Sequence, residues 1–288
     1  MLLRIAVTAT LLALLAYCMP LPAHAQSYGI EMGITSPEMA AWFQQHAGPA
    51  DIARVDHPND IGLISGLAVG YKMAIFKSAS QIAQFLASNA GAIDIVGYNL
   101  EPGQQHDPAE LANPVAAARN VRAVADQYGK AVAIGLTHDL TLQYGAAMAP
   151  YADIWVLQIQ KAQNNPSMAG EFVSQMLPAL QRANPAIQVY VQIRTNSQPA
   201  ALAQLVSGLG PVNVSILTQR QDVQDAVNVA AAFFGDRTQR VQHPAPVAVA
   251  GQPTMTAESG DSSVGLMILG VIAVVFLLPS GKKKEKPA

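Results

Sequence analysis

An apolar, β-prone run ends abruptly in a carboxylate in the stretch Ile93-Asp94-Ile95-Val96-Gly97-Tyr98-Asn99-Leu100-Glu101-Pro102. A buried strand that presents an acidic residue at its C-terminal end is the arrangement by which parallel barrels place a general acid. The stretch therefore predicts a buried strand and one candidate catalytic group, Glu101. It does not by itself specify a reaction.

Similar strand-like runs recur through the middle of the chain, and each is followed by an amphipathic or alanine-rich stretch. The expected strands cover residues 28–33, 52–56, 72–77, 93–100, 131–137, 153–160, 187–194 and 212–218. The expected helices cover residues 37–45, 60–67, 80–88, 114–127, 141–149, 167–182, 200–207 and 223–234. Eight such units in about 210 residues predict an α/β fold, a compact (β/α)8 barrel of the TIM type. The alternative is a doubly wound open sheet.

Short sequence motifs indicate where helices begin and whether a phosphate-binding loop is present. Ser80, Thr141, Ser197 and Asp222 lie at or shortly before the expected helix starts and are of capping types. The first strand is followed by Gly33-Ile34-Thr35-Ser36, which is neither a dinucleotide fingerprint nor a P-loop. We therefore expect no nucleotide cofactor.

The first 25 residues read as a secretory signal peptide. Arg4 supplies the positive charge, residues 11–15 lie in the apolar segment, and Ala23-His24-Ala25 is a small-x-small cleavage site. A lipoprotein signal using Cys18 is the alternative, but the residue before it is a bulky tyrosine. Cys18 is the only cysteine, so cleavage after Ala25 would leave a mature protein without a disulfide or a thiolate nucleophile.

The C-terminal end has three parts that follow the barrel, for which we expect residues 26–236. Residues 237–263 are rich in Pro, Ala, Gln, Ser and Thr and predict a flexible tether. Residues 264–280 are largely apolar, and residues 281–288 include four lysines. We expect a single transmembrane anchor with a cytoplasmic basic tail, which places the barrel in the cell envelope. A buried C-terminal helix and a processed sorting tail are the alternatives.

Polar residues at the strand ends should converge on one face if the strands form a barrel. Alternation places Asn99 and Glu101 on one face of their strand and Tyr98 on the other. Paired amide side chains suit a ligand with many hydroxyl groups, because each amide donates and accepts. The alternative is that the glutamines cap the barrel and meet only water. Around Glu101 as the acid, the candidate binding residues are Glu31, Tyr98, Asn99, Gln158, Gln160, Gln192 and Arg194.

At Glu101 the chain resembles the family 18 glycoside hydrolases, the chitinase-like barrels. Asp94, Gly97, Asn99 and Glu101 have the spacing of the Asp-x-x-Asp-x-Asp-x-Glu signature that ends the fourth strand in that family. The resemblance implies that Glu101 is the general acid. In the family, the aspartate two residues before this glutamate orients the substrate's acetamido group. Here the two middle acids are replaced by Gly97 and Asn99, which puts substrate-assisted hydrolysis in doubt.

Other chemistries have less support. A two-carboxylate glycosidase needs a second acid, for which Glu31 and Asp139 are the candidates, because the seventh expected strand ends without one. Metal-ligand types occur without the spacing of a metal motif, so no metal is expected. These residues are Asp56, His57, His106, His138 and Asp139.

We therefore expect a membrane-tethered barrel that acts on or recognises an envelope or extracellular glycan, or another polar small molecule. The alternative is a non-catalytic surface binding or assembly module. Aromatic residues make up only 6% of the chain, and its two tryptophans, Trp42 and Trp155, are expected in the core, which argues against an efficient polysaccharide hydrolase. Nucleic acid is not expected as a partner, because the net charge of -2 already includes four tail lysines.

Overall fold

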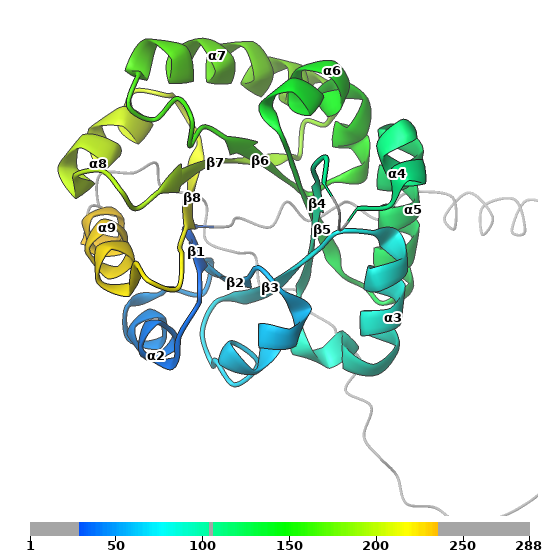
Figure 1. Ribbon diagram of the computed structural model, residues 1–288, viewed down its shortest axis with the longest axis horizontal. Helices are drawn as coiled ribbons and strands as arrows, with labels where there is room; N and C mark the ends of the chain where they lie inside the picture. The colour runs from blue at the N-terminus through cyan, green and yellow to red at the C-terminus, as the bar shows by residue number, and fades with distance from the viewer. Residues whose placement is uncertain (1–28, 104–105, 236–288) are drawn as a thin grey trace, which may run out of the picture. The chain divides into compact units, whose positions relative to one another are not determined.

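The protein folds as a closed barrel of eight parallel strands, joined in sequence order (Figure 1). A computed structural model describes residues 29–103 and 106–235. The strands are β1 (Glu31–Gly33), β2 (Ile52–Val55), β3 (Tyr71–Phe76), β4 (Ile95–Leu100), β5 (Ala131–Leu136), β6 (Ile154–Gln158), β7 (Gln188–Arg194) and β8 (Asn213–Leu217). Because β8 pairs with β1, the barrel prediction is confirmed and the open-sheet alternative is wrong.

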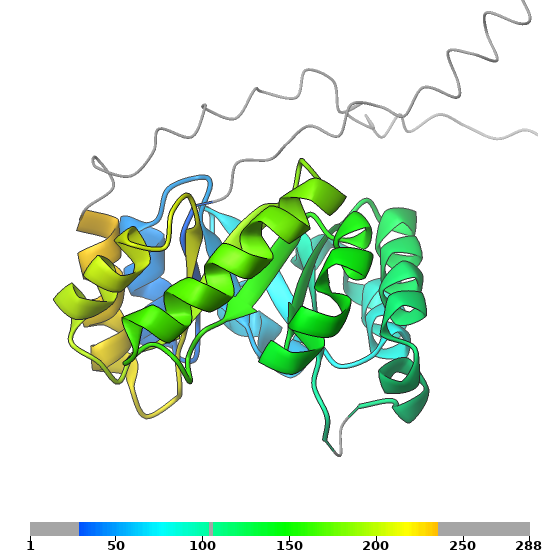
Figure 2. The ribbon, with the colours of Figure 1, turned by 90° about the horizontal axis from the view of Figure 1, so that it is seen from above.

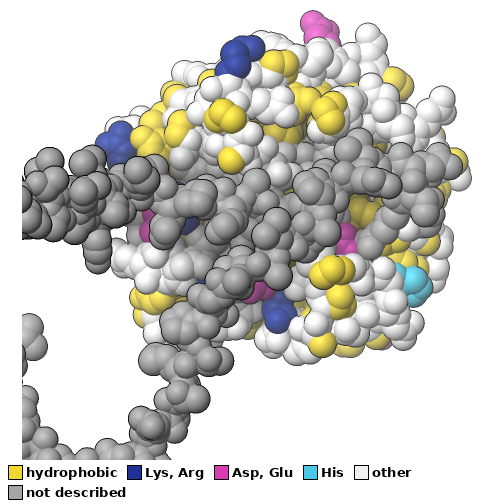
Figure 3. Space-filling model, turned by 180° about the vertical axis from the view of Figure 1, so that it is seen from behind, with side chains coloured by type: hydrophobic (Ala, Val, Ile, Leu, Met, Phe, Trp, Pro, Cys, Tyr) yellow, Lys and Arg dark blue, Asp and Glu magenta, His cyan; other side chains and the backbone are white. Residues whose placement is uncertain are grey.

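Helices surround the barrel in both ribbon views (Figures 1 and 2). The α-helices are α2 (Pro37–His46), α3 (Ala79–Asn89), α4 (Pro108–Ala112), α5 (Pro114–Gln127), α6 (His138–Met148), α7 (Pro166–Ala183), α8 (Pro199–Ser207) and α9 (Val223–Gly235). The 3-10 helices are η1 (Pro58–Leu63), η2 (Ala90–Ala92) and η3 (Ala149–Tyr151). On the uncovered part of the face in Figure 3, Lys and Arg side chains lie singly rather than in a cluster.

Short polar side chains and prolines mark where the helices begin. The side chain at the N-cap accepts a hydrogen bond from a first-turn N–H in α2, α3, α5 and α7, at Ser36, Ser78, Asn113 and Asn165. In three of these four helices, a proline follows the cap, where its missing N–H costs nothing. Ser80 and Thr141, which we expected near helix starts, lie in the first turns of α3 and α6, where Ser78 and Thr137 are the N-caps.

The expected helix over residues 60–67 is wrong. This connection forms only η1, a 3-10 helix that ends at Leu63. Gly62 and Gly66 lie in the expected range, and each glycine weakens a helix by about 1 kcal/mol relative to alanine. The second strand is therefore followed by a short turn of helix rather than by a full α-helix.

Two separate apolar layers stabilise the barrel. The larger layer lies between strands and helices and contains Trp155, Val191 and Tyr98, each at most 1% exposed. The smaller one fills the barrel interior with side chains such as Ile52, Ile95 and Tyr190. Strand alternation produces both, because successive side chains point to opposite faces. Trp155 therefore packs in the core, as expected.

Aspartates tie the N-terminal ends of neighbouring strands together. Asp51 accepts a hydrogen bond from the Ile30 N–H at 2.8 Å, and Asp94 accepts one from the Lys72 N–H at 2.9 Å. Asp153 accepts one from the Val132 N–H at 2.8 Å. Each aspartate directly precedes an even-numbered strand, so the three share one structural role. They stabilise the end of the barrel opposite the strands' C-terminal ends.

Several sequence predictions concern parts of the chain outside the described residues. They are the signal peptide (1–25), the tether (237–263), the transmembrane segment (264–280) and the basic tail (281–288). Within residues 29–103 and 106–235, no helix is both long enough and apolar enough to cross a bilayer.

Candidate functional site

A cavity of about 670 Å³ opens at the C-terminal ends of the strands. Side chains from every strand or from the loop that follows it line this cavity. On β5, Ala133 and Gly135 contribute little bulk, and a Cβ built on Gly135 would meet nothing closer than 3.6 Å. These small residues leave the upper barrel interior open, whereas large apolar side chains close the lower interior.

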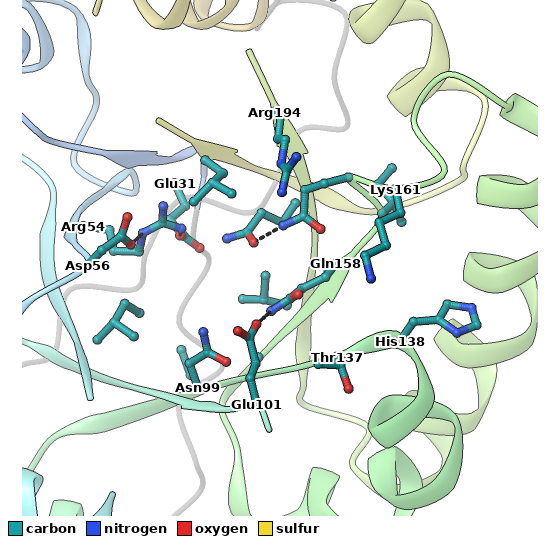
Figure 4. A pocket seen from close by; sticks show the side chains of 18 of the residues that line it. Glu31, Arg54, Asp56, Asn99, Glu101, Thr137, His138, Gln158, Lys161 and Arg194 are labelled. Atoms are coloured by element: carbon teal, nitrogen blue, oxygen red, sulfur yellow. Dashed lines mark hydrogen bonds and ion pairs between the residues drawn. The ribbon is translucent and has the colours of Figure 1, made fainter. Parts of the chain in front are cut away.

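Glu101 and Asn99 both project into this cavity from the end of β4 (Figure 4). The Gln158 side chain on β6 donates from Nε2 to Glu101 Oε1 at 2.8 Å. Asn99 Oδ1 is buried and has no hydrogen-bond partner among the described residues. The structure therefore brings Gln158 of β6 to Asn99 and Glu101, which alternation alone had placed on one face of their own strand.

A second hydrogen-bonded pair, of two glutamines, lies beside the first and joins the segment just after β6 to β7. Gln160 donates from Nε2 to Gln192 Oε1, and Gln192 donates from Nε2 to the Ser215 hydroxyl at 3.2 Å. Gln158 and Gln192 are partners in the β6–β7 register. The Gln158–Glu101 pair and the Gln160–Gln192 pair thus form one polar wall of the cavity.

The barrel interior holds a buried polar cluster of Glu31, Arg54 and Ser215, and the partly exposed Asp56 joins it through Arg54. The Arg54 guanidinium donates from Nη1 to Glu31, and its Nε lies 2.9 Å from Asp56 Oδ1. Ser215 also donates to Glu31 Oε1, at 3.0 Å. Glu31 and Arg54 are at most 1% exposed. Glu31 is the first residue of β1, so it lies deep in the cavity rather than at its mouth.

Burial and the Arg54 charge act in opposite directions on the pKa of Glu31. Desolvation raises the pKa of the Glu31 carboxyl above its usual range, and the nearby Arg54 charge opposes this rise. Glu31 and Asp56 both interact with the same guanidinium. Their charges are therefore partly compensated within the protein.

Tyr98 and Arg194 occupy different positions relative to the cavity. The Tyr98 ring lies in the layer beneath the helices, and its hydroxyl donates to Glu110 Oε2 at 2.7 Å. Burial, together with this hydrogen bond, raises the pKa of Tyr98. Arg194 is exposed at the end of β7 and its side chain points into the cavity (Figure 4). The structure therefore does not bring the Tyr98 hydroxyl to the polar wall that Glu101 and the glutamines form.

The residues that match the glycosidase signature are at opposite ends of the barrel. Asp94 lies at the N-terminal end, where it binds the Lys72 N–H. At Gly97, a Cβ would lie 2.3 Å from Ile75 Cδ1 and 3.2 Å from the Ala74 carbonyl oxygen. Ile75 therefore fills the space that a side chain at this position would need. Only Asn99 and Glu101 of the signature reach the cavity.

Asp139, the other candidate second acid, lies in solvent. Its side chain is 98% exposed, and its Oδ1 is 3.2 Å from His138 Nδ1. The His138 ring packs on Phe172, with 4.2 Å between the ring centroids. Within residues 29–103 and 106–235, no three His, Cys, Asp or Glu side chains group closely enough to hold a metal ion.

Sequence reasoning missed three residues that organise this site: Arg54, Ser215 and Gln163, a buried side chain that accepts a hydrogen bond from the Arg194 N–H at 2.8 Å. Arg54 carried a usable signal, because it is a lone charge in the strand Ile52-Ala53-Arg54-Val55 and shares a face with Ile52. Ser215 and Gln163 carried none, since an isolated serine or glutamine is common in any strand or loop.

Comparisons with known proteins do not assign a family. The profile of one family, described as the mitochondrial ribosomal protein L51 / S25 / CI-B8 domain, matches residues 171–230. In the structure this segment runs from α7 into α9 and is one part of the barrel. No curated protein matches the chain.

Among solved structures, the chain is similar to a 3-keto-L-gulonate-6-phosphate decarboxylase from Vibrio cholerae (12% identity, TM-score 0.47, 73% of this chain and 98% of that chain). It is also similar to a putative deoxyribose-phosphate aldolase from Toxoplasma gondii (12% identity, TM-score 0.49, 73% of this chain and 95% of that chain). A third similar structure is a 2,3-dimethylmalate lyase (11% identity, TM-score 0.47, 81% of this chain and 88% of that chain). At these identities and TM-scores the three carry no argument about chemistry, and the barrel follows from the strand pairing itself.

Proposed function

We propose that this barrel recognises a glycan in the cavity at the C-terminal ends of its strands. One observation carries the proposal: Glu101, Gln158, Gln160 and Gln192 form a continuous polar wall in a cavity of about 670 Å³. A volume of this size suits a small polar ligand or a few sugar residues, since ligand pockets span about 300–1,000 Å³.

The wall keeps hydrogen-bonding capacity for a ligand. Gln158 uses one N–H on Glu101, and Gln160 uses one N–H on Gln192. Each amide has two N–H donors and two carbonyl lone pairs, and a carboxylate accepts at both oxygens. Sugar hydroxyls both donate and accept, so they match such a mixed surface better than a purely apolar or purely anionic ligand does.

Recognition is better supported than hydrolysis. A two-carboxylate glycosidase requires a second acid beside the scissile bond. Of the carboxylates that line the cavity, Glu31 and Asp56 interact with Arg54, and Asp139 is almost fully exposed. Substrate assistance is also disfavoured, because Asn99 stands where the family 18 signature has its orienting aspartate. Hydrolysis with Glu101 as the general acid remains the alternative function.

Glu101→Gln tests the two functions against each other. We expect the wild-type protein to bind glycans on an array without shortening them. The variant should bind its glycan roughly 10- to 100-fold more weakly, because a hydrogen bond to a charged group contributes about 1.5–3 kcal/mol. Titration calorimetry measures the affinity, and mass spectrometry of the incubated glycan detects cleavage.

Glu171→Gln is the matched control, since Glu171 is an exposed carboxylate on the outer helix α7. This control should bind like the wild type. Cleavage by the wild type that disappears in Glu101→Gln would reject pure recognition in favour of hydrolysis. Equal cleavage by both would exclude a catalytic role for Glu101.

The sequence signals at both ends support recognition outside the cytoplasm. A cleaved signal peptide and a C-terminal anchor would hold the barrel in the envelope, where glycans are exposed. We therefore expect the full-length protein in the membrane fraction and a chain truncated after Gly235 in the soluble fraction. Immunoblotting of both fractions measures this. A full-length mature protein that stays soluble and keeps its C-terminal lysines would rule out the anchor.

A further inference from the structure

Two cations on the β6–β7 side of the cavity lack a counter-charge in the described part of the chain. Lys161 follows β6 and Arg194 ends β7, and both line the cavity. Figure 4 shows both side chains directed into it. Neither belongs to any ion pair formed by the described residues.

Arg194 is held in place by a buried side chain. Its N–H donates to Gln163 Oε1 at 2.8 Å, and Gln163 Nε2 donates to the Arg194 carbonyl oxygen at 3.4 Å. The same amide nitrogen also contacts Asn196 Oδ1 at 2.8 Å. Gln163 is 5% exposed. The position of the Arg194 backbone is therefore fixed by the loop that follows β6.

That same loop carries Lys161. It is attached to β7 on both sides of this lysine, by Gln160 on Gln192 and by Gln163 on Arg194. Lys161 and Arg194 therefore belong to two segments, the loop after β6 and the end of β7, that are hydrogen-bonded to each other. This places both positive charges on one side of the cavity mouth.

The anionic groups of the cavity have other partners. Glu31 and Asp56 interact with Arg54, and Glu101 accepts from the neutral Gln158. No carboxylate of the described residues lies within ion-pairing distance of Lys161 or Arg194. Both cations are exposed, so they are available to a negatively charged group of a ligand. Arginine suits this role, since its planar fork matches carboxylate, sulfate and phosphate groups.

We propose that the glycan is acidic, and that Arg194, positioned by Gln163 and assisted by Lys161, binds its carboxylate, sulfate or phosphate group. This inference rests on the proposed glycan recognition. The neutral hydroxyls of the same ligand contact the polar wall of amides and Glu101. The acidic substituent lies on the β6–β7 side, where two cations face it. Lys77, which follows β3 and also lines the cavity without an ion pair among the described residues, offers a single charge.

The test uses the full-length protein in detergent and an array of acidic glycans, each printed beside its neutral form. The neutral forms are carboxyl-reduced, desulfated or dephosphorylated. We expect the acidic member of a pair to bind at least about tenfold more tightly, in line with a charge-assisted hydrogen bond. Arg194→Gln should abolish this preference, and Lys161→Gln should reduce it. The substituent that gives the largest preference identifies the acidic group.

Lys130→Gln is the matched control for net charge. Lys130 lies just before β5, at the opposite end of the barrel, and should leave the preference unchanged. A second arm measures thermal stabilisation by sodium sulfate against sodium chloride at equal ionic strength. Sulfate stabilises folded proteins in general, so the readout is the difference between variants: the stabilisation should be equal in the wild type and Lys130→Gln and smaller in Arg194→Gln.

The two arms separate the inference from the function on which it rests. Equal binding of acidic and neutral forms would overturn the inference and leave glycan recognition standing. Sulfate stabilisation that depends on Arg194, without any glycan binding, would reject glycan recognition and keep the anion site. Absence of both responses would overturn both.

Discussion

Replacing Arg54 by methionine is expected to lower the free energy of unfolding by about 3–5 kcal/mol, because removing one partner of a buried ion pair leaves the other uncompensated. Glu31 is fully buried and would lose its only cationic partner among the described residues. Denaturant unfolding monitored by circular dichroism measures the loss.

The loss should depend on pH. Burial raises the pKa of Glu31, and removing the opposing Arg54 charge should raise it further. A carboxyl with a raised folded-state pKa favours the folded state fully below the pKa of the unfolded chain. This contribution is lost as the pH rises through the folded-state pKa. The deficit of Arg54→Met should therefore be smallest in acid and grow towards neutral pH.

The double variant Arg54→Met/Glu31→Gln provides the control. It removes both charges of the buried pair and leaves Asp56, whose side chain is 37% exposed, to water. Most of the lost stability should return, since paired removal of buried charges is often close to neutral. A double variant as unstable as Arg54→Met would show that the unpaired Glu31 charge is not the cause.

Val191→Asp should be strongly destabilising, because it changes the outer apolar layer. Val191 is 0% exposed and packs beneath the helices. An aspartate there would be an uncompensated buried charge, with an expected cost of about 3–5 kcal/mol. Val156→Asp should cost less, because Val156 is 7% exposed and lines the cavity, where water can hydrate a carboxylate. Thermal and denaturant unfolding measure both variants.

Gln175→Asp on α7 is the matched control for the added charge, because Gln175 is exposed. Its effect should stay within about 0.5 kcal/mol, as is usual for surface substitutions. If Val191→Asp unfolds at the same denaturant concentration as the wild type, the assignment of this face of β7 to the core is wrong.

Arg54→Met and Val191→Asp probe the inner and the outer face of the barrel wall, on β2 and β7 respectively. Outside, an unbroken apolar layer joins strands to helices. Inside, the apolar filling gives way to the Glu31–Arg54 cluster and then to the amide wall. The small residues Ala133 and Gly135 keep this upper interior open. The cavity thus results from the small size of the side chains in the upper barrel interior. Glu31 and Arg54 line its deep end.

The sequence by itself determined the succession of strands and all but one of the α-helices that we expected. Alternation, proline positions and capping residues act over a few residues, so their pattern survives in the linear chain. The exception at residues 60–67 arose where two glycines outweighed an amphipathic pattern. Alternation also placed Asn99 and Glu101 on one face and Tyr98 on the other, which the structure shows.

Only the tertiary structure decided which of these residues meet. Glu101 meets Gln158, Gln160 meets Gln192, and Glu31 is bound by Ser215 from 184 residues away. No local pattern encodes such pairs, because barrel closure, strand register and the size of neighbouring side chains set them. The same closure gave Arg54 two carboxylate partners and left Arg194 and Lys161 without one among the described residues. The chemistry of the cavity therefore follows from long-range packing, although the sequence predicts the strands that carry Asn99, Gln158 and Gln192.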